Sequence, residues 1–297
     1  MSILFALLSA FTNACTAVMQ RLASKSVPTE SKGVTGHARH LVRQPVWVLG
    51  MVLMGATFAF QAIALYFGQL AVVQPVLVLE LIFALALRRL WLRDRIATRT
   101  WGAAALTCAG LAGFLLIAHP REGHRVPGVT AWVVALSVRG ALVLVLLVLG
   151  RRGSPARRAG LLGAAAALVW SVDAAFVKAM TDLLSKQGWL ALLVHWPLYG
   201  VIVTGILGTV LLQAAFAAGP LSMSQSVLLI VDSLASITLG VELFGETLND
   251  SALAITFSVV ALAVMSVGVI FTSLWAPPPM TPRAGPSPAL RDADGVA

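Results

Sequence analysis

Long apolar segments, separated by short polar ones, follow one another along most of the chain. A helix crosses a hydrocarbon core of ~30 Å with about 20 residues, because it rises ~1.5 Å per residue. Nine segments reach about this length: residues 2–19, 46–67, 71–91, 101–118, 129–149, 161–180, 198–217, 221–244 and 253–274. They lack the alternation typical of barrel strands, so the pattern predicts an all-α polytopic membrane protein with nine transmembrane helices.

Two stretches do not fit this pattern. Residues 188–218 are almost continuously apolar, and Pro197 within them removes a backbone donor and favours a break. We expect residues 188–196 to form an interfacial or re-entrant segment, with a short tenth span as the alternative. Residues 276–297 contain six prolines and four charged residues, and we expect this tail to be disordered.

The composition agrees with a chain that lies in lipid. Hydrophobic residues make up 59% of the chain and charged residues 11%, which excludes an ordinary soluble enzyme. We assign the net charge of +9 to membrane-facing loops rather than to a nucleic-acid surface. Two cysteines cannot build a disulfide scaffold or a zinc cluster, and we expect no metal site and no cofactor.

Basic residues are distributed unequally between the two sides of the predicted spans. Sixteen of the 21 lysines and arginines fall on one side and three on the other, with two inside spans. Basic loops remain in the cytoplasm. We therefore expect a multi-pass protein of the plasma (inner) membrane, with its N-terminus outside and its C-terminus in the cytoplasm.

The two halves of the chain share a pattern of polar residues. Five pairs recur at an offset of about 152 positions: Pro45 and Pro197, Gln61 and Gln213, Gly68 and Gly219, Gln74 and Gln225, and Glu80 and Asp232. The offset pairs spans one to four with spans six to nine. Paired spans are five crossings apart, an odd number, so they run in opposite directions.

This parity predicts two inverted four-helix repeats and a linker helix. We place the first repeat at residues 1–119, the linker helix with a basic cytoplasmic loop at 120–158, the second repeat at 159–275 and the tail at 276–297. Inverted repeats of this kind are common in secondary transporters, whose solute site lies near the midplane between the repeats.

Three stretches make the chain similar to a known group of carriers. They are Gln61-Ala62-Ile63-Ala64-Leu65, Val73-Gln74-Pro75-Val76-Leu77 and Gly240-Val241-Glu242-Leu243-Phe244-Gly245-Glu246. With the repeat layout, they resemble the drug/metabolite transporter superfamily over residues 1–275, in particular its EamA-like and NIPA-like nine-span branches. The resemblance implies a carrier of small molecules or ions without a nucleotide site. The chain departs from the ten-span pattern, because each half lacks a separate second helix.

Three carboxylates fall near the centres of predicted spans: Glu80, Asp173 and Asp232. Ionisable groups at this depth cost several kcal/mol, so each needs a partner, a wet cavity or a function. Such a carboxyl group can bind and release a proton, or bind a cation directly. We expect the three acids to form a substrate or coupling-ion site. The alternative is a protonated acid that only hydrogen-bonds a neighbouring helix.

Other polar residues in the spans allow two interpretations. Asn13 and the glutamines Gln61, Gln74, Gln213 and Gln225 suit a cavity that recognises a polar solute, or serve as interhelical hydrogen bonds worth ~0.6 kcal/mol each.

The two cations inside spans also need an explanation. Arg139, alone in the linker span, is expected to pair with a membrane acid or face a wet cavity, or else to lie at the contact of a homodimer. Lys178 is expected to extend its long side chain to the headgroups.

We therefore expect a secondary transporter of a small polar metabolite or drug-like solute, coupled to protons or cations. A magnesium or other divalent-cation permease and a non-transporting scaffold are the alternatives. The sequence has no P-loop, G-x-G-x-x-G, H-E-x-x-H or G-x-S-x-G motif, and we do not expect an enzyme. The expected partners are the lipid bilayer and the solute.

Overall fold

A computed structural model describes residues 1–25, 45–91, 93, 95–123 and 126–275. The predicted tail and part of the first basic loop lie outside the described residues. Within them the secondary structure is helical, apart from one bridged pair, Arg121 and Thr247. The helices are α1 (Ser2–Lys25), α3 (Pro45–Tyr66), α4 (Leu70–Leu77), α5 (Glu80–Trp91), α6 (Thr98–Ala118), α7 (Val129–Leu149), α8 (Pro155–Gln187), α9 (Trp189–Val194), α10 (Pro197–Ala218), α11 (Leu221–Phe244) and α12 (Ala252–Trp275).

Nine segments of the described chain are helical, long and apolar enough to cross a membrane, with α4 and α5 together forming the third. This confirms the expected all-helical chain with nine candidate spans and indicates a multi-pass membrane protein. The short helix α9 has six residues, or about 9 Å at 1.5 Å per residue, so it cannot cross the membrane. The alternative of a tenth span there is wrong.

The third span is not the single helix that its apolar run predicts. It contains Pro75, which has no backbone N–H to donate, and the helix breaks between Leu77 and Glu80. Tight turn bonds bridge the break: the Val78 N–H donates to the Pro75 carbonyl at 3.2 Å and the Leu79 N–H to the Val76 carbonyl at 3.1 Å. The consequence is that Glu80 lies in the first turn of α5.

Helix α8 is longer than its apolar core predicts. It begins at Pro155, where the Ser154 side chain accepts a hydrogen bond from the Arg157 N–H, and it ends at Gln187. The helix therefore begins before the predicted span of residues 161–180 and ends after it. Its 33 residues include many small alanines and are the most buried of the nine spans. Thus α8 forms the centre of the molecule.

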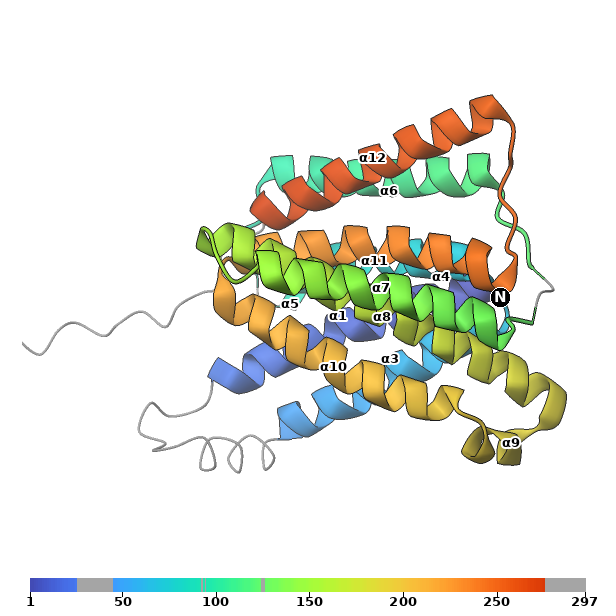
Figure 1. The fold of residues 1–297 in the computed structure, drawn as a ribbon. Coiled ribbons are helices and arrows are strands. Elements are labelled where there is room, and N and C mark those ends of the chain that lie inside the picture. Colours follow the sequence, from blue (N-terminus) through green and yellow to red (C-terminus); the bar gives the residue numbers. More distant parts are fainter. Residues whose placement is uncertain (26–44, 92, 94, 124–125, 276–297) are drawn as a thin grey trace, which may run out of the picture.

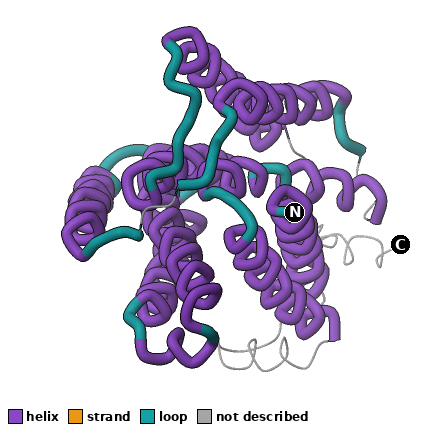
Figure 2. The backbone as a smooth tube through the Cα atoms, turned by 90° about the vertical axis from the view of Figure 1, so that its right-hand side faces the viewer, coloured by secondary structure: helices purple, strands orange, loops and turns teal. Residues whose placement is uncertain are grey.

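Helix pairs give the bundle its architecture. Along the chain, α1 packs with α3 and α5, while α8 packs with α10 and α11. Helices α4 and α11 pack against each other between these groups. Helices α6 and α12 form a separate pair at the top of Figure 1, and the turned view of Figure 2 shows the same pair at its upper edge.

Glycines allow the close approach of α6 and α12. A Cβ on Gly110 would meet the backbone of Met265, at 2.7 Å from its Cα, and a Cβ on Gly268 would meet Thr107, at 2.5 Å from its Oγ1. These small residues thus serve intramolecular packing here.

Candidate functional site

Glu80, at the start of α5, contacts the first helix of the chain. The side-chain amide of Asn13 on α1 donates a hydrogen bond to its Oε2. The break in the third span determines this placement, because it sets Glu80 at a helix start rather than within a continuous helix. Two residues that the sequence singled out separately therefore form one pair.

The other two membrane acids belong to the second half of the chain. Asp173 is buried on α8, and its Oδ1 accepts a hydrogen bond from the Thr204 hydroxyl of α10 at 2.7 Å. Asp232 on α11 interacts electrostatically with both Glu80 and Asp173. Its Oδ1 is buried and has no hydrogen-bond partner among the described residues. We call Glu80, Asp173 and Asp232, with Asn13 and Thr204, the acid cluster.

The four candidate glutamines have different surroundings. Gln74 on α4 is buried, and its Nε2 has no hydrogen-bond partner in the described structure. Gln61 and Gln225 are half-buried. Gln213 is exposed on α10, so its surroundings differ from those of the buried Gln74. The approximate repeat therefore relates their positions in sequence without giving them the same surroundings.

Arg139 pairs with an acid outside the acid cluster. Its guanidinium group lies 2.9 Å from Oε2 of Glu242 and donates to the Thr238 hydroxyl at 3.0 Å, and both partners belong to α11. The buried arginine thus ties the linker helix α7 to α11 within one chain. Its partner Glu242 lies on the exposed side of α11. Arg139 is consequently a neighbour of the second half and no member of the acid cluster.

A second group of charges lies at the end of the bundle that holds Ser2. Lys178 on α8 is buried, and its Nζ donates to the carbonyl of Leu65 in the last turn of α3 at 3.1 Å. Glu246 is buried and accepts hydrogen bonds from the N–H groups of Leu70 at 2.6 Å and Ala71 at 2.9 Å, in the first turn of α4. Lys178 and Glu246 also attract each other electrostatically.

This arrangement, which we call the charge clasp, complements both helix ends beside the α3–α4 turn. The C-terminus of a helix carries partial negative charge and the N-terminus partial positive charge, so a lysine suits the end of α3 and a carboxylate suits the start of α4. Burial raises the pKa of the Glu246 carboxyl, and the hydrogen bonds from Ala71 and Leu70 and the charge of Lys178 oppose that rise.

The expected snorkelling of Lys178 is wrong. The prediction ended the sixth span at residue 180, but α8 continues to Gln187, so Lys178 lies more than two turns inside the helix and faces the protein. Its ammonium group also lies 5.9 Å from the centre of the Phe244 ring.

Glu246 belongs to the motif that closes the eighth span, but its role was missed. Gly245 ends α11 with a φ of +67°, a conformation that favours glycine. The N–H groups of both Gly245 and Glu246 then donate to the Gly240 carbonyl. A Cβ on Gly240 would collide with the Glu246 carboxylate. The glycines therefore turn the chain so that Glu246 folds back toward α4, a contact across 175 residues that no local pattern could indicate.

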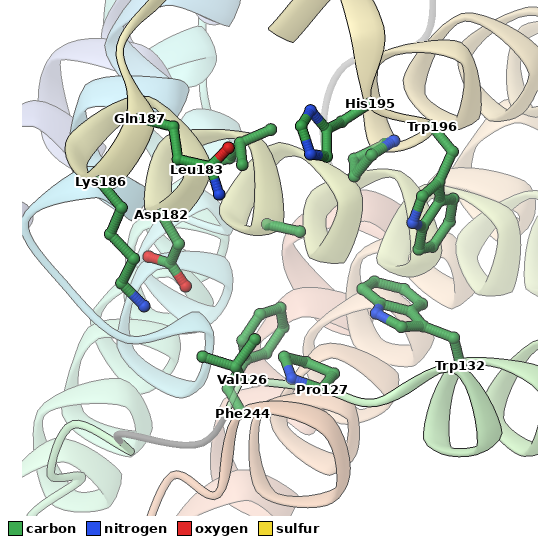
Figure 3. Close-up of a pocket in the computed structure, with 12 residues that line it drawn as sticks. Val126, Pro127, Trp132, Asp182, Leu183, Lys186, Gln187, His195, Trp196 and Phe244 are labelled. Carbon is green, nitrogen blue, oxygen red and sulfur yellow. The ribbon is translucent and has the colours of Figure 1, made fainter. Parts of the chain in front are cut away.

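A cavity of about 410 Å³ opens beside the charge clasp (Figure 3). Trp132 of α7, Trp196 and Phe244 give it an aromatic wall, and Asp182 and Lys186 of α8 add charges. The rings pack against one another, with Trp132 and Trp196 edge to face at a centroid distance of 5.0 Å. Asp182 lies 3.7 Å from the Lys178 ammonium group. The cavity and the charge clasp thus share contacts.

These observations define a multi-pass membrane protein with buried acids at helix contacts. The uncharacterized protein Cgl0250/cg0304 of Corynebacterium glutamicum is 30% identical over 274 residues, which are 92% of this chain and 94% of the relative. The chain belongs to the same family as that protein. No protein-family model matches the chain, and no solved structure matches it.

Proposed function

We propose that the protein is a secondary transporter that moves a small polar solute across the plasma (inner) membrane in exchange or symport with protons. The acid cluster is the observation on which the proposal depends. Asp232 on α11 interacts electrostatically with Glu80 on α5 and with Asp173 on α8, and among the described residues one carboxylate oxygen of Asp232 is buried without a partner. An unpaired buried oxygen is costly unless it binds something during the working cycle.

The pattern of helix pairs supports an inverted repeat of the drug/metabolite transporter type. In the first half α1 packs with α3 and α5, and in the second half the equivalent α8 packs with α10 and α11. Glu80 of the third span and Asp232 of the eighth interact across the two halves. Alternating access would then move the halves relative to each other around the acid cluster.

Proton movement in proteoliposomes tests this function. The purified protein is reconstituted with a trapped pH-sensitive dye and offered amino acids, nucleosides, sugars, aromatic amines and Mg²⁺ in turn. We expect one solute class to move protons through the parental protein, and both Glu80→Gln and Asp232→Asn to abolish this movement. Asp250→Asn, in the exposed α11–α12 loop, is the matched control. Proton movement at the parental rate in both acid variants would refute the coupling role.

The predicted orientation is tested separately. A single cysteine at Arg157 should react with an impermeant maleimide only from the cytoplasmic side, and one at Asn249 only from outside. Reaction of both from one side would be incompatible with the orientation that the basic residues predict.

A further inference from the structure

We propose that Lys178 and Glu246 form the gate that closes the solute path at the Ser2 end of the bundle. This inference depends on the proposed transport function and adds to it a place where the path opens and closes. The side chains of the two gate residues hydrogen-bond to backbone groups of Leu65, Leu70 and Ala71, which are not among the expected site residues. The role of the gate residues is to hold two halves of the molecule together at one end.

The three hydrogen bonds of the charge clasp join the first half of the chain to the second. Lys178 holds the Leu65 carbonyl, and Glu246 holds the N–H groups of Leu70 and Ala71. Charged hydrogen bonds of this kind are the strong ones in a protein interior. Each is made only when the α3–α4 turn lies against α8 and the end of α11, so separation of the halves here must break all three.

The loops after α6 and after α11, which lie beside the clasp, also bind each other through backbone hydrogen bonds. Arg121 and Thr247 exchange two backbone hydrogen bonds, at 2.9 and 3.2 Å, and the Asn249 N–H donates to the Ala118 carbonyl at 2.8 Å. A Cβ on Gly123 would collide with the backbone of Phe244 and Gly245, so this loop packs directly on the end of α11. The segment after α6, which ends the first repeat and begins the linker region, thus lies against the second-half segment after α11.

The clasp is continuous with the helices that hold the acid cluster. Asp173 and Lys178 lie on the same helix, α8. Asp232 lies on α11, which ends immediately before Gly245 and Glu246. The N-terminus of α4 is held by Glu246, and α4 leads through the Pro75 break to Glu80. Any change of position among the three acid-bearing segments therefore acts on the clasp, which is the relation that a gate needs.

The cavity of Figure 3 is the approach to this gate. Asp182 and Phe244 line it. The Nζ atom of Lys178 lies 3.7 Å from Oδ1 of Asp182 and 5.9 Å from the centre of the Phe244 ring. A solute in the cavity touches the side chains that hold the lysine in place, before it reaches the interior.

Cysteine accessibility tests the gate without any solute. Val73 on α4 is fully buried one turn below the clasp. Val73→Cys is made in a chain with Cys15→Ala and Cys108→Ala and is reacted with an impermeant maleimide. We expect Lys178→Met and Glu246→Gln to raise the labelling rate at least about tenfold, because each removes a charged hydrogen bond that only the closed state makes. The controls Arg151→Met, in the exposed α7–α8 loop, and Asp250→Asn should leave it unchanged. Equal labelling in all variants would overturn the gate.

A reversible cross-link tests the same gate without weakening it. Arg121 and Thr247 are opposite each other in an antiparallel bridge, where Cα atoms lie about 5.5 Å apart, a separation that a disulfide spans. In the same cysteine-free chain, Arg121→Cys with Thr247→Cys should stop solute-driven proton movement when oxidised and restore it when reduced. Each single variant should transport in both conditions. A cross-linked protein that transports at the parental rate would also overturn the gate.

The two experiments separate the gate from the function. If none of the offered solutes makes the parental protein move protons, the transport proposal fails. The labelling of Val73→Cys still shows in that case whether the clasp closes this end. If transport is present and the cross-link has no effect, the gate alone fails.

Discussion

The side-chain amide of Asn13 on α1 donates a hydrogen bond to the carboxylate of Glu80 at the start of α5, across 67 residues of chain. The contact ties the first helix to the interrupted third span. The contact also allows a structural role of Glu80 to be separated from a proton-binding role. A glutamine at this position can still accept the hydrogen bond from Asn13, but it cannot bind and release a proton.

We expect Glu80→Gln to keep the melting temperature of the purified protein while it abolishes coupled proton movement. Glutamine retains an oxygen that accepts from Asn13. Asn13→Leu removes the donor and should destabilise the fold by roughly 1–3 kcal/mol. Thermal unfolding in detergent, measured for both variants, checks this. A large loss of melting temperature in Glu80→Gln would show that the residue is mainly structural.

Asp232 should respond in the opposite direction. Its buried Oδ1 has no partner among the described residues, so the carboxylate costs stability in the resting protein. We expect Asp232→Leu to raise the free energy of unfolding by about 1 kcal/mol and to eliminate transport. Chemical unfolding together with the proteoliposome assay tests this. A destabilised Asp232→Leu protein would mean that the acid has a stabilising partner.

The ion pair of Arg139 and Glu242 should contribute little. The pair is 2.9 Å apart, but Glu242 is more than half exposed, so we expect a coupling free energy of ~0.2–1 kcal/mol. The cycle of Arg139→Met, Glu242→Gln and the double variant measures it. Arg139→Met alone should leave the α7–α11 contact intact through the apolar surfaces. A coupling well above this range would place the pair in a drier environment.

Gly110 and Gly102 on α6 provide a matched test of helix packing. A Cβ on Gly110 would overlap the backbone of Met265 and Ala261 on α12, whereas one on Gly102 would meet nothing within 4 Å. Gly110→Ala should therefore lower stability by about 1–3 kcal/mol through overpacking, and Gly102→Ala should raise it by up to about 1 kcal/mol through helix propensity. Thermal unfolding of the two alanine variants distinguishes them, and equal effects would contradict the close contact.

Glu246 should make stability depend on pH in a predictable direction. Burial raises its pKa in the folded protein, so the folded state binds this proton more tightly than the unfolded state. Its contribution to stability is therefore largest below the ordinary pKa of a glutamate and is lost as pH rises through the raised value. The free energy of unfolding of the parental protein and of Glu246→Gln is measured by thermal unfolding over a range of pH. The parental value minus that of the variant should fall as pH rises. A difference that increases with pH would show that folding lowers the pKa of Glu246 instead of raising it.

The spans could be predicted from sequence because their length is set by the bilayer. All nine occur among the described residues, and Asn13, Glu80, Asp173 and Asp232 were identified by their polarity alone. Polarity in an apolar helix is informative, because lipid offers such a group no partner.

The surroundings of each residue could not be predicted so well. A membrane helix is apolar on both its lipid face and its protein face, so periodicity does not show which way Gln213 or Lys178 points. Gln213 proved exposed and Lys178 buried. Glu246 was seen only as part of a motif, since its partners lie 175 and 176 residues earlier.

The long reach of Glu246 has a consequence for biosynthesis. While the ribosome has delivered only the first four spans, the start of α4 lacks the carboxylate that later holds it, because that carboxylate is made 175 residues after Ala71. Until then, the N–H groups of Leu70 and Ala71 at the start of α4 lack the acceptor that they have in the folded protein. The early half of the chain reaches its final shape only after the eighth span has emerged and turned back.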